Sequence, residues 1–180
     1  MKVHVGKVVF FKIAAFISIS FMMCTASAAT QKDSETWSVT SAWVRVLPEK
    51  EQTPVLILLN SSLRMKVDKE IVPSAKTGKD AMWAVKVDYV GHFLLSELST
   101  DSPALKLLFD ERASYLLEFI HGKSSVDVLE DKSIETGKET QAIISKLGKH
   151  ELSEIMNKYS SRIEQTQIAL QVQAMEGASQ

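Results

Sequence analysis

Short, mostly apolar runs occur at three places along the chain, and each is typical of a buried β-strand. Val55 to Leu59 follows a charged loop bounded by Pro48 and Pro54. Strands of a central parallel sheet are covered on both faces, so they show an apolar run without alternation. Ser114 to Lys123 combines β-branched and aromatic residues with a Gly-Lys turn, and another apolar run follows at Val126 to Leu129. We therefore expect a strand at each run.

Two segments carry clear signals for the start or end of a helix. Ser102 is a candidate N-cap, and Pro103 suits the first position of a helix. One face of this helix carries Leu105, Leu108, Phe109 and Arg112. Ser133 to Leu147 has the spacing of an amphipathic helix, although Gly137 is unfavourable in its interior. Gly148 provides a stop for this second helix.

The region between the first strand and the first helix is open to more than one interpretation. Asn60 to Gly78 fits a helix that Pro73 ends or kinks. Lys79 to Tyr89 fits helical spacing and strand alternation equally well, and both alternatives stay open. His92 to Leu98 is mostly apolar and favours a strand. Trp37 to Leu47, which precedes the first predicted strand, is also ambiguous and fits either one strand or a strand followed by a helix.

The C-terminal part of the chain, His150 to Met175, predicts a separate long helix with an apolar seam. The seam residues alternate at spacings of four and three, which is the heptad pattern of pairing helices. We expect a protein partner or a second copy of the chain to bind at Leu152, Met156, Tyr159, Ile163 and Leu170. Thr166 and Gln173 also fall on the seam and favour a conditional contact. The alternative is that this stripe packs back on the domain.

The first 29 residues have the organisation of a secretory signal peptide. Lys2, Lys7 and Lys12 precede an apolar stretch from Ile13 to Met23, and the small residues of Ala26-Ser-Ala28 suit a cleavage site. We expect cleavage near Ala28 and Ala29. The mature protein would then be periplasmic or secreted, with no stable membrane span. An uncleaved membrane anchor is the alternative.

Composition narrows the possible chemistry of the mature chain. Cys24 is the only cysteine of the 180 residues, so cleavage would remove every thiol. Disulfides, cysteine-ligated zinc and thiol redox chemistry are then excluded. The residues beyond the signal hold 18 basic and 22 acidic side chains, which gives no basis for nucleic-acid binding. We expect no cofactor.

Residues 53 to 147 resemble thioredoxin-like domains, on the strength of Pro54 to Leu59 and Ser102 to Lys123. In that family a central parallel strand precedes the active-site loop. A helix started by proline then leads to a strand, a Gly-Lys hairpin, a second strand and an amphipathic helix, to which Val126 to Leu147 correspond. The resemblance implies an α/β fold with a thioredoxin-like mixed sheet flanked by helices.

The chain departs from that family at both redox positions. Ser61-Ser-Leu-Arg-Met-Lys66 stands where the family has Cys-x-x-Cys, and Ala113-Ser-Tyr115 stands where the family has a cis-proline. The resemblance therefore implies a redox-inactive binding form of the fold. The expected organisation is a signal peptide at 1–29, a body at 30–148, and a C-terminal amphipathic helix with a loose tail at 149–180.

These observations favour an exported cell-envelope accessory protein that acts through protein–protein contacts, and we find no catalytic motif. His150-Glu151, for example, lacks the second histidine of a His-Glu-x-x-His metalloprotease helix. The alternative function is a small exported hydrolase or metal-dependent enzyme. That enzyme would require His92, His121 and His150 to converge beside carboxylates, and sequence spacing does not bring them together.

Overall fold

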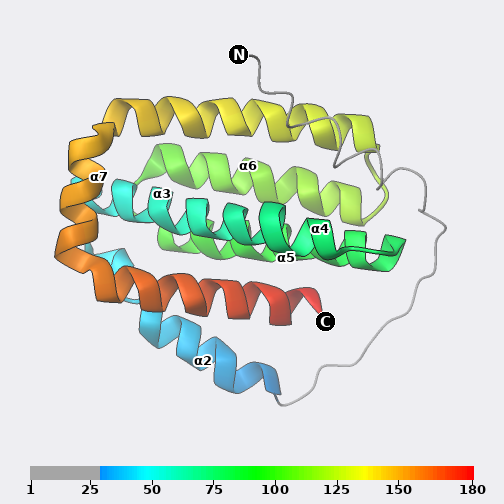
Figure 1. The fold of residues 1–180 in the computed structure, drawn as a ribbon, viewed down its shortest axis with the longest axis horizontal. Coiled ribbons are helices and arrows are strands. Elements are labelled where there is room, and N and C mark those ends of the chain that lie inside the picture. Colours follow the sequence, from blue (N-terminus) through cyan, green and yellow to red (C-terminus); the bar gives the residue numbers. More distant parts are fainter. Residues whose placement is uncertain (1–28) are drawn as a thin grey trace.

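The computed structural model describes residues 29–180, and these residues form a bundle of helices without a β-strand (Figure 1). The elements in chain order are α2 (Ala29–Ser41), the 3₁₀ turn η1 (Val44–Val46), α3 (Glu49–Lys66), the π turn η2 (Val67–Ile71), α4 (Val72–Ser74), α5 (Gly78–Leu98), α6 (Pro103–Ile120) and α7 (Val126–Ala178). No helix among the described residues is both long and apolar enough to cross a membrane. Residues 1–28 of the predicted signal peptide (1–29) lie outside the described part of the chain, and its last residue, Ala29, is the first residue of α2.

Helix α7 consists of three helical segments, because two of its residues have a non-helical backbone. Gly148 has φ 76° and ψ 157°, and Tyr159 has φ −125° and ψ 16°. Figure 1 shows the first segment (126–147) lying beside α6 and the middle segment (149–158) crossing one end of the bundle. The last segment (160–178), here called the return segment, runs back along α3, α5 and α2. Gly148 thus ends the helix that precedes it, as its sequence position predicts.

The bend at Gly148 yields a prediction with a matched control. Gly148→Ala should lower the free energy of unfolding by about 1–3 kcal/mol, because its backbone lies in a region almost restricted to glycine. Gly137 lies inside the first helical segment with open space around it. Gly137→Ala should therefore raise the free energy of unfolding by about 0.5–1 kcal/mol. Urea unfolding measures both variants, and equal effects would contradict the bend.

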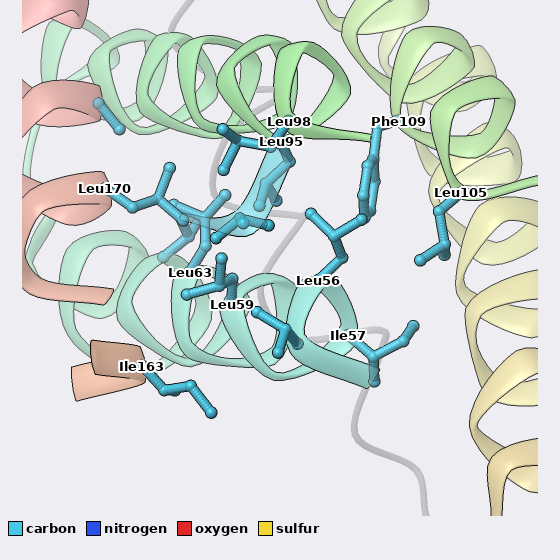
Figure 2. Close-up of a cluster of buried hydrophobic side chains, with 14 of the residues drawn as sticks. Leu56, Ile57, Leu59, Leu63, Leu95, Leu98, Leu105, Phe109, Ile163 and Leu170 are labelled. Carbon is cyan, nitrogen blue, oxygen red and sulfur yellow. The ribbon is translucent and has the colours of Figure 1, made fainter. Parts of the chain in front are cut away.

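The main core lies between α3, α5, α6 and the return segment of α7 (Figure 2). Its fully buried large apolar side chains are Leu56, Ile57, Leu59, Leu63, Leu95, Leu98, Leu105, Phe109, Ile163 and Leu170. Figure 2 shows Leu170 of the return segment pointing toward Leu63 of α3. A second, smaller cluster joins α5, α6 and the start of α7 through Val85, Tyr115, Leu116, Phe119 and Leu129. The return segment is therefore part of the core.

The prediction of an α/β, thioredoxin-like fold is wrong, because the described residues contain helices and no strand. The predicted strands at Val55–Leu59, His92–Leu98, Ser114–Ile120 and Val126–Leu129 lie within α3, α5, α6 and α7 respectively. A short apolar run is equally compatible with a strand covered on both faces and with a helix covered on several sides. Helix α3 is of the second kind, since α5 and α7 both pack against it.

The Ser114–Lys123 stretch shows how the helix differs from the expected strand and hairpin. Tyr115, Leu116 and Phe119 are buried, which is the spacing of one helix face. Gly122, with φ 69°, does not make a hairpin. The amide of Gly122 donates to the Phe119 carbonyl, and the amide of Lys123 donates to the Glu118 carbonyl. These two bonds form the Schellman motif that ends many helices.

Other helix predictions fare better. Helix α6 begins at Pro103 as expected, although the Ser102 hydroxyl contacts Thr53 Oγ1 at 2.7 Å and does not cap the helix. The open region between residues 60 and 78 is helical as far as Ser74. Helix α5 resolves the second ambiguity in favour of a helix. It starts with a capping box, in which Thr77 and Asp80 each bind the other's backbone amide.

Candidate functional site

A cluster of charged and polar side chains lies inside the bundle, centred on Asp88 of α5. Asp88 is only 5% exposed. Its Oδ2 accepts a hydrogen bond from Arg112 Nη2 of α6 at 2.7 Å and another from Arg64 Nη1 of α3 at 3.3 Å. One carboxylate thus connects three helices. We call Asp88, Arg64, Arg112, His92 and Asn60 the Asp88 cluster.

Arg112 extends the cluster to a fourth helix. Its Nη1 donates to Thr136 Oγ1 at 3.1 Å, and Thr136 is a buried residue of the first segment of α7. The hydroxyl of Tyr115 lies 3.3 Å from both Thr136 Oγ1 and Ser133 Oγ. The guanidinium carbon of Arg112 lies 5.8 Å from the centre of the Tyr115 ring, a distance compatible with a cation–π contact. The first segment of α7 therefore docks on α6 partly through polar contacts.

The imidazole of His92 lies on another side of Asp88. Its Nδ1 is 2.8 Å from the backbone oxygen of Asp88 and 3.0 Å from Asp88 Oδ1. Its Nε2 is 3.0 Å from Asn60 Oδ1 of α3. His92 is 1% exposed, and the Phe109 ring meets the imidazole edge-on at 5.9 Å. Both ring nitrogens thus have partners within the core.

The cluster reaches the surface where α3 passes into the π turn η2. Asp68 lies in this turn and pairs with Arg64 at 3.0 Å. Both side chains are partly exposed, whereas Asp88 is buried. π turns inside helices frequently occur at functional sites, and this one is where the Asp88 cluster meets solvent.

The electrostatics of the cluster are set by burial and by opposite charges. Burial alone raises the pKa of Asp88, but the electrostatic interaction with His92, the positive charge of Arg64 and a hydrogen bond from His92 outweigh it, so this pKa lies below its usual range. Partial burial raises the pKa of Asp68, and the nearby charge of Asp88 adds to that rise, so this pKa lies above its usual range despite Arg64. Of the two carboxyl groups, that of Asp88 is therefore the one that is firmly ionised.

A second polar group holds the bend of α7 at Tyr159. The Tyr159 hydroxyl donates to Glu51 Oε2 of α3 at 2.5 Å, and Lys158 Nζ lies 2.9 Å from Glu51 Oε1. The hydrogen bonds from Tyr159 and Lys158 lower the pKa of Glu51. The Tyr159 ring packs against Trp43 at 5.2 Å, and Trp43 Nε1 donates to Thr166 Oγ1 at 3.0 Å. These contacts fix where the return segment begins.

The structure places the predicted partner-binding residues in different environments. Ile163 and Leu170 are fully buried in the core. Leu152 and Tyr159 are half-buried and pack against it. Met156 is 38% exposed. The alternative in which the stripe packs back on the domain therefore describes Ile163 and Leu170, whereas binding of a partner at the seam stays a prediction.

The three histidines of the alternative enzyme hypothesis do not form one site. His92 is buried beside Asp88, His121 is exposed after the end of α6, and His150 is exposed in the middle segment of α7. His150 lies 3.6 Å from Glu154. Among residues 29–180 no group of three His, Cys, Asp or Glu side chains is arranged to hold a metal ion.

Sequence reasoning missed the Asp88 cluster, although the sequence holds two hints of it. Asp88 and His92 lie four residues apart in a largely apolar helix, and Arg112 shares the apolar face of α6. Each is unusual enough to suggest a buried polar group that requires partners.

Comparisons of the chain with protein-family models, with curated proteins and with solved structures find no match.

Proposed function

We propose that this chain is an exported cell-envelope accessory protein that acts by binding another protein. The observation that carries the proposal is a solvent-facing strip without charge on the return segment of α7. The eleven residues from Gln165 to Met175 include no charged side chain. Ile168 is 57% exposed and Val172 is 38% exposed, and Gln165 is exposed beside them. We call Gln165, Ile168 and Val172 the outer strip.

The composition of the outer strip differs from that of an ordinary solvated helix face. Ile168 and Val172 lie four residues apart and so share one side of the helix, away from buried Leu170 and Ala174. The solvent side of an amphipathic helix normally carries charges. The first segment of α7 follows this rule, with exposed Asp131, Glu135, Lys138 and Glu139. Depletion of charged side chains is characteristic of the centres of protein–protein interfaces, which supports a binding role for the outer strip.

Two neighbouring glutamines have a structural role that the outer strip lacks. Gln167 Nε2 donates to the Leu58 carbonyl at 3.4 Å, and Gln171 Nε2 donates to Ser62 Oγ at 2.8 Å, so both attach the return segment to α3. On the side of the return segment that faces α3, the absence of charged side chains follows from packing. Packing does not account for the exposed apolar side chains of Ile168 and Val172, which supports a binding partner at the outer strip.

Site-specific photo-crosslinking in cells of the source organism tests the proposal. A crosslinking amino acid at Ile168 or Val172 should give a discrete adduct with a second protein. The same amino acid at Val39 or Val128, which are exposed apolar residues of α2 and the first segment of α7, should not. The adduct should be recovered from the envelope with a chain that begins at Ala29.

Two outcomes would contradict the proposal. Crosslinks that are absent at the outer strip, or equally abundant at all four positions, would contradict binding through this strip. A chain that stays in the cytoplasm with residues 1–28 attached would contradict export. Because the two readouts are separate, either part of the proposal can fail alone.

A further inference from the structure

Every polar neighbour of the His92 ring is an oxygen atom. Nδ1 faces the backbone carbonyl of Asp88 and its Oδ1, and Nε2 faces Asn60 Oδ1. A carbonyl and an ionised carboxylate can only accept hydrogen bonds, so Nδ1 must carry a hydrogen. The Asn60 amide is different, because a rotation by 180° exchanges its oxygen for an NH₂ group.

Asn60 can therefore satisfy Nε2 in both protonation states of His92. When the ring is neutral, its Nε2 lone pair accepts a hydrogen from the rotated amide. When the ring is an imidazolium, Nε2–H donates to Asn60 Oδ1, which lies 3.0 Å away. His92 and Asn60 are both buried, so water does not readily replace a lost partner. The pair loses no hydrogen bond when a proton arrives.

The proton changes the charge balance of the surrounding helices. Asp88 belongs to the same helix as His92, α3 and η2 contribute Arg64 and Asp68, and α6 contributes Arg112. With a neutral His92, these two carboxylates balance two guanidiniums.

The remaining groups around the cluster leave that balance unchanged. Burial raises the pKa of the Tyr115 phenol of α6, which keeps it neutral. The first segment of α7 contributes the neutral hydroxyls of Thr136 and Ser133. A proton on His92 therefore leaves one positive charge in excess, and protonation of Asp68 would add to it.

We propose that His92 and Asn60 form a pH-sensitive switch inside the folded bundle. Acidification protonates Nε2, the Asn60 amide rotates to accept that hydrogen, and the Asp88 cluster passes from balanced charge to a net positive charge between α3, α5 and α6. The excess positive charge weakens the contacts of the Arg64 and Arg112 guanidiniums within the cluster. Of these two residues, Arg64 at the π turn is the one that can move toward solvent. This regulation is independent of the outer strip.

Nitrogen-15 NMR of the histidine side chains in the purified protein tests the switch. Glutamine substitutions of the other three histidines, His4, His121 and His150, identify the His92 signals by elimination. At neutral pH, His92 should carry its hydrogen on Nδ1 alone. On acidification it should become an imidazolium while the backbone spectrum stays that of the folded protein. The Asn60 side-chain NH₂ signals should shift with the same midpoint.

A variant sharpens the test. Asn60→Asp offers only acceptor oxygens and a negative charge, so the His92 midpoint should rise by about one pH unit or more. If Asn60→Asp fails to fold, the titration of the wild-type protein alone decides whether the switch exists. A His92 ring that carries its hydrogen on Nε2 at neutral pH, or that keeps one protonation state until the protein unfolds, would overturn the switch. Asn60 side-chain NH₂ signals that do not shift during the His92 titration would also overturn the switch.

Discussion

Asp88→Ala is expected to lower the free energy of unfolding by about 3–5 kcal/mol. The substitution leaves the buried guanidinium of Arg112 without its carboxylate, and the remaining hydrogen bond to Thr136 does not neutralise a charge. Burial of an unpaired charge is far more costly than loss of a surface ion pair. Because small domains are stable by only about 5–15 kcal/mol, this single change removes much of the margin.

Two comparisons separate this effect from a general loss of charge. Glu70→Ala removes the partner of Lys66 on the surface of α3 and η2, where Glu70 is 62% exposed, and should cost less than about 0.5 kcal/mol. The paired change Asp88→Leu with Arg112→Met removes both buried charges together, so it should cost clearly less than Asp88→Ala alone. Urea unfolding measures all three. An Asp88→Ala effect no larger than that of Glu70→Ala would contradict the buried cluster.

Ile163→Asp is expected to cost about 4 kcal/mol or more, enough to unfold much of the protein at ordinary temperature. The change removes a fully buried side chain from the contact between the return segment and α3, and places a carboxylate there without a partner. Ile168→Asp makes the same chemical change five residues later in the same helix. Ile168 faces solvent, so its substitution should alter stability by no more than about 0.5 kcal/mol.

Thermal unfolding followed by circular dichroism distinguishes the two variants. Ile163→Asp should melt at a temperature far below that of the wild type. Ile168→Asp should melt at the same temperature as the wild type. A reversed order, or equal melting temperatures, would show that the return segment is rotated about its axis or is not docked. The comparison also separates binding from folding, because Ile168→Asp should lose the protein partner without losing the fold.

The sequence predicts some helix ends well, because local chemistry alone determines them. Pro103 lacks an amide hydrogen and is suited to a helix start, and Gly148 adopts a positive φ that ends a helix. The strand predictions fail at α3 because Val55 to Leu59 is buried on several sides of a helix, which erases helical periodicity. The bend at Tyr159 has no local signal, since it depends on contacts with Trp43 and Glu51 from distant parts of the chain.

The candidate sites, too, could be predicted from the sequence only in part. The spacing of four residues between Asp88 and His92, and between Arg64 and Asp68, is visible in the sequence as two possible pairs. That Arg112 meets Asp88 depends on how α5 and α6 pack, which spacing does not reveal. On the seam of the C-terminal helix, Ile163 and Leu170 are buried, whereas Met156 is 38% exposed. The burial of Ile163 and Leu170 follows from the bend that returns the helix to the bundle.

The most direct test of binding at the outer strip is the rate of maleimide labelling of single cysteines, measured in a chain with Cys24→Ser. Ile168→Cys and Val172→Cys should react quickly in the purified protein, as should Val39→Cys on α2, whereas Leu170→Cys should be protected. In intact cell envelopes, the account predicts that labelling at positions 168 and 172 slows strongly while labelling at position 39 is unchanged. Labelling at 168 and 172 that is equally fast in envelopes and in the purified protein would contradict a bound partner at the outer strip.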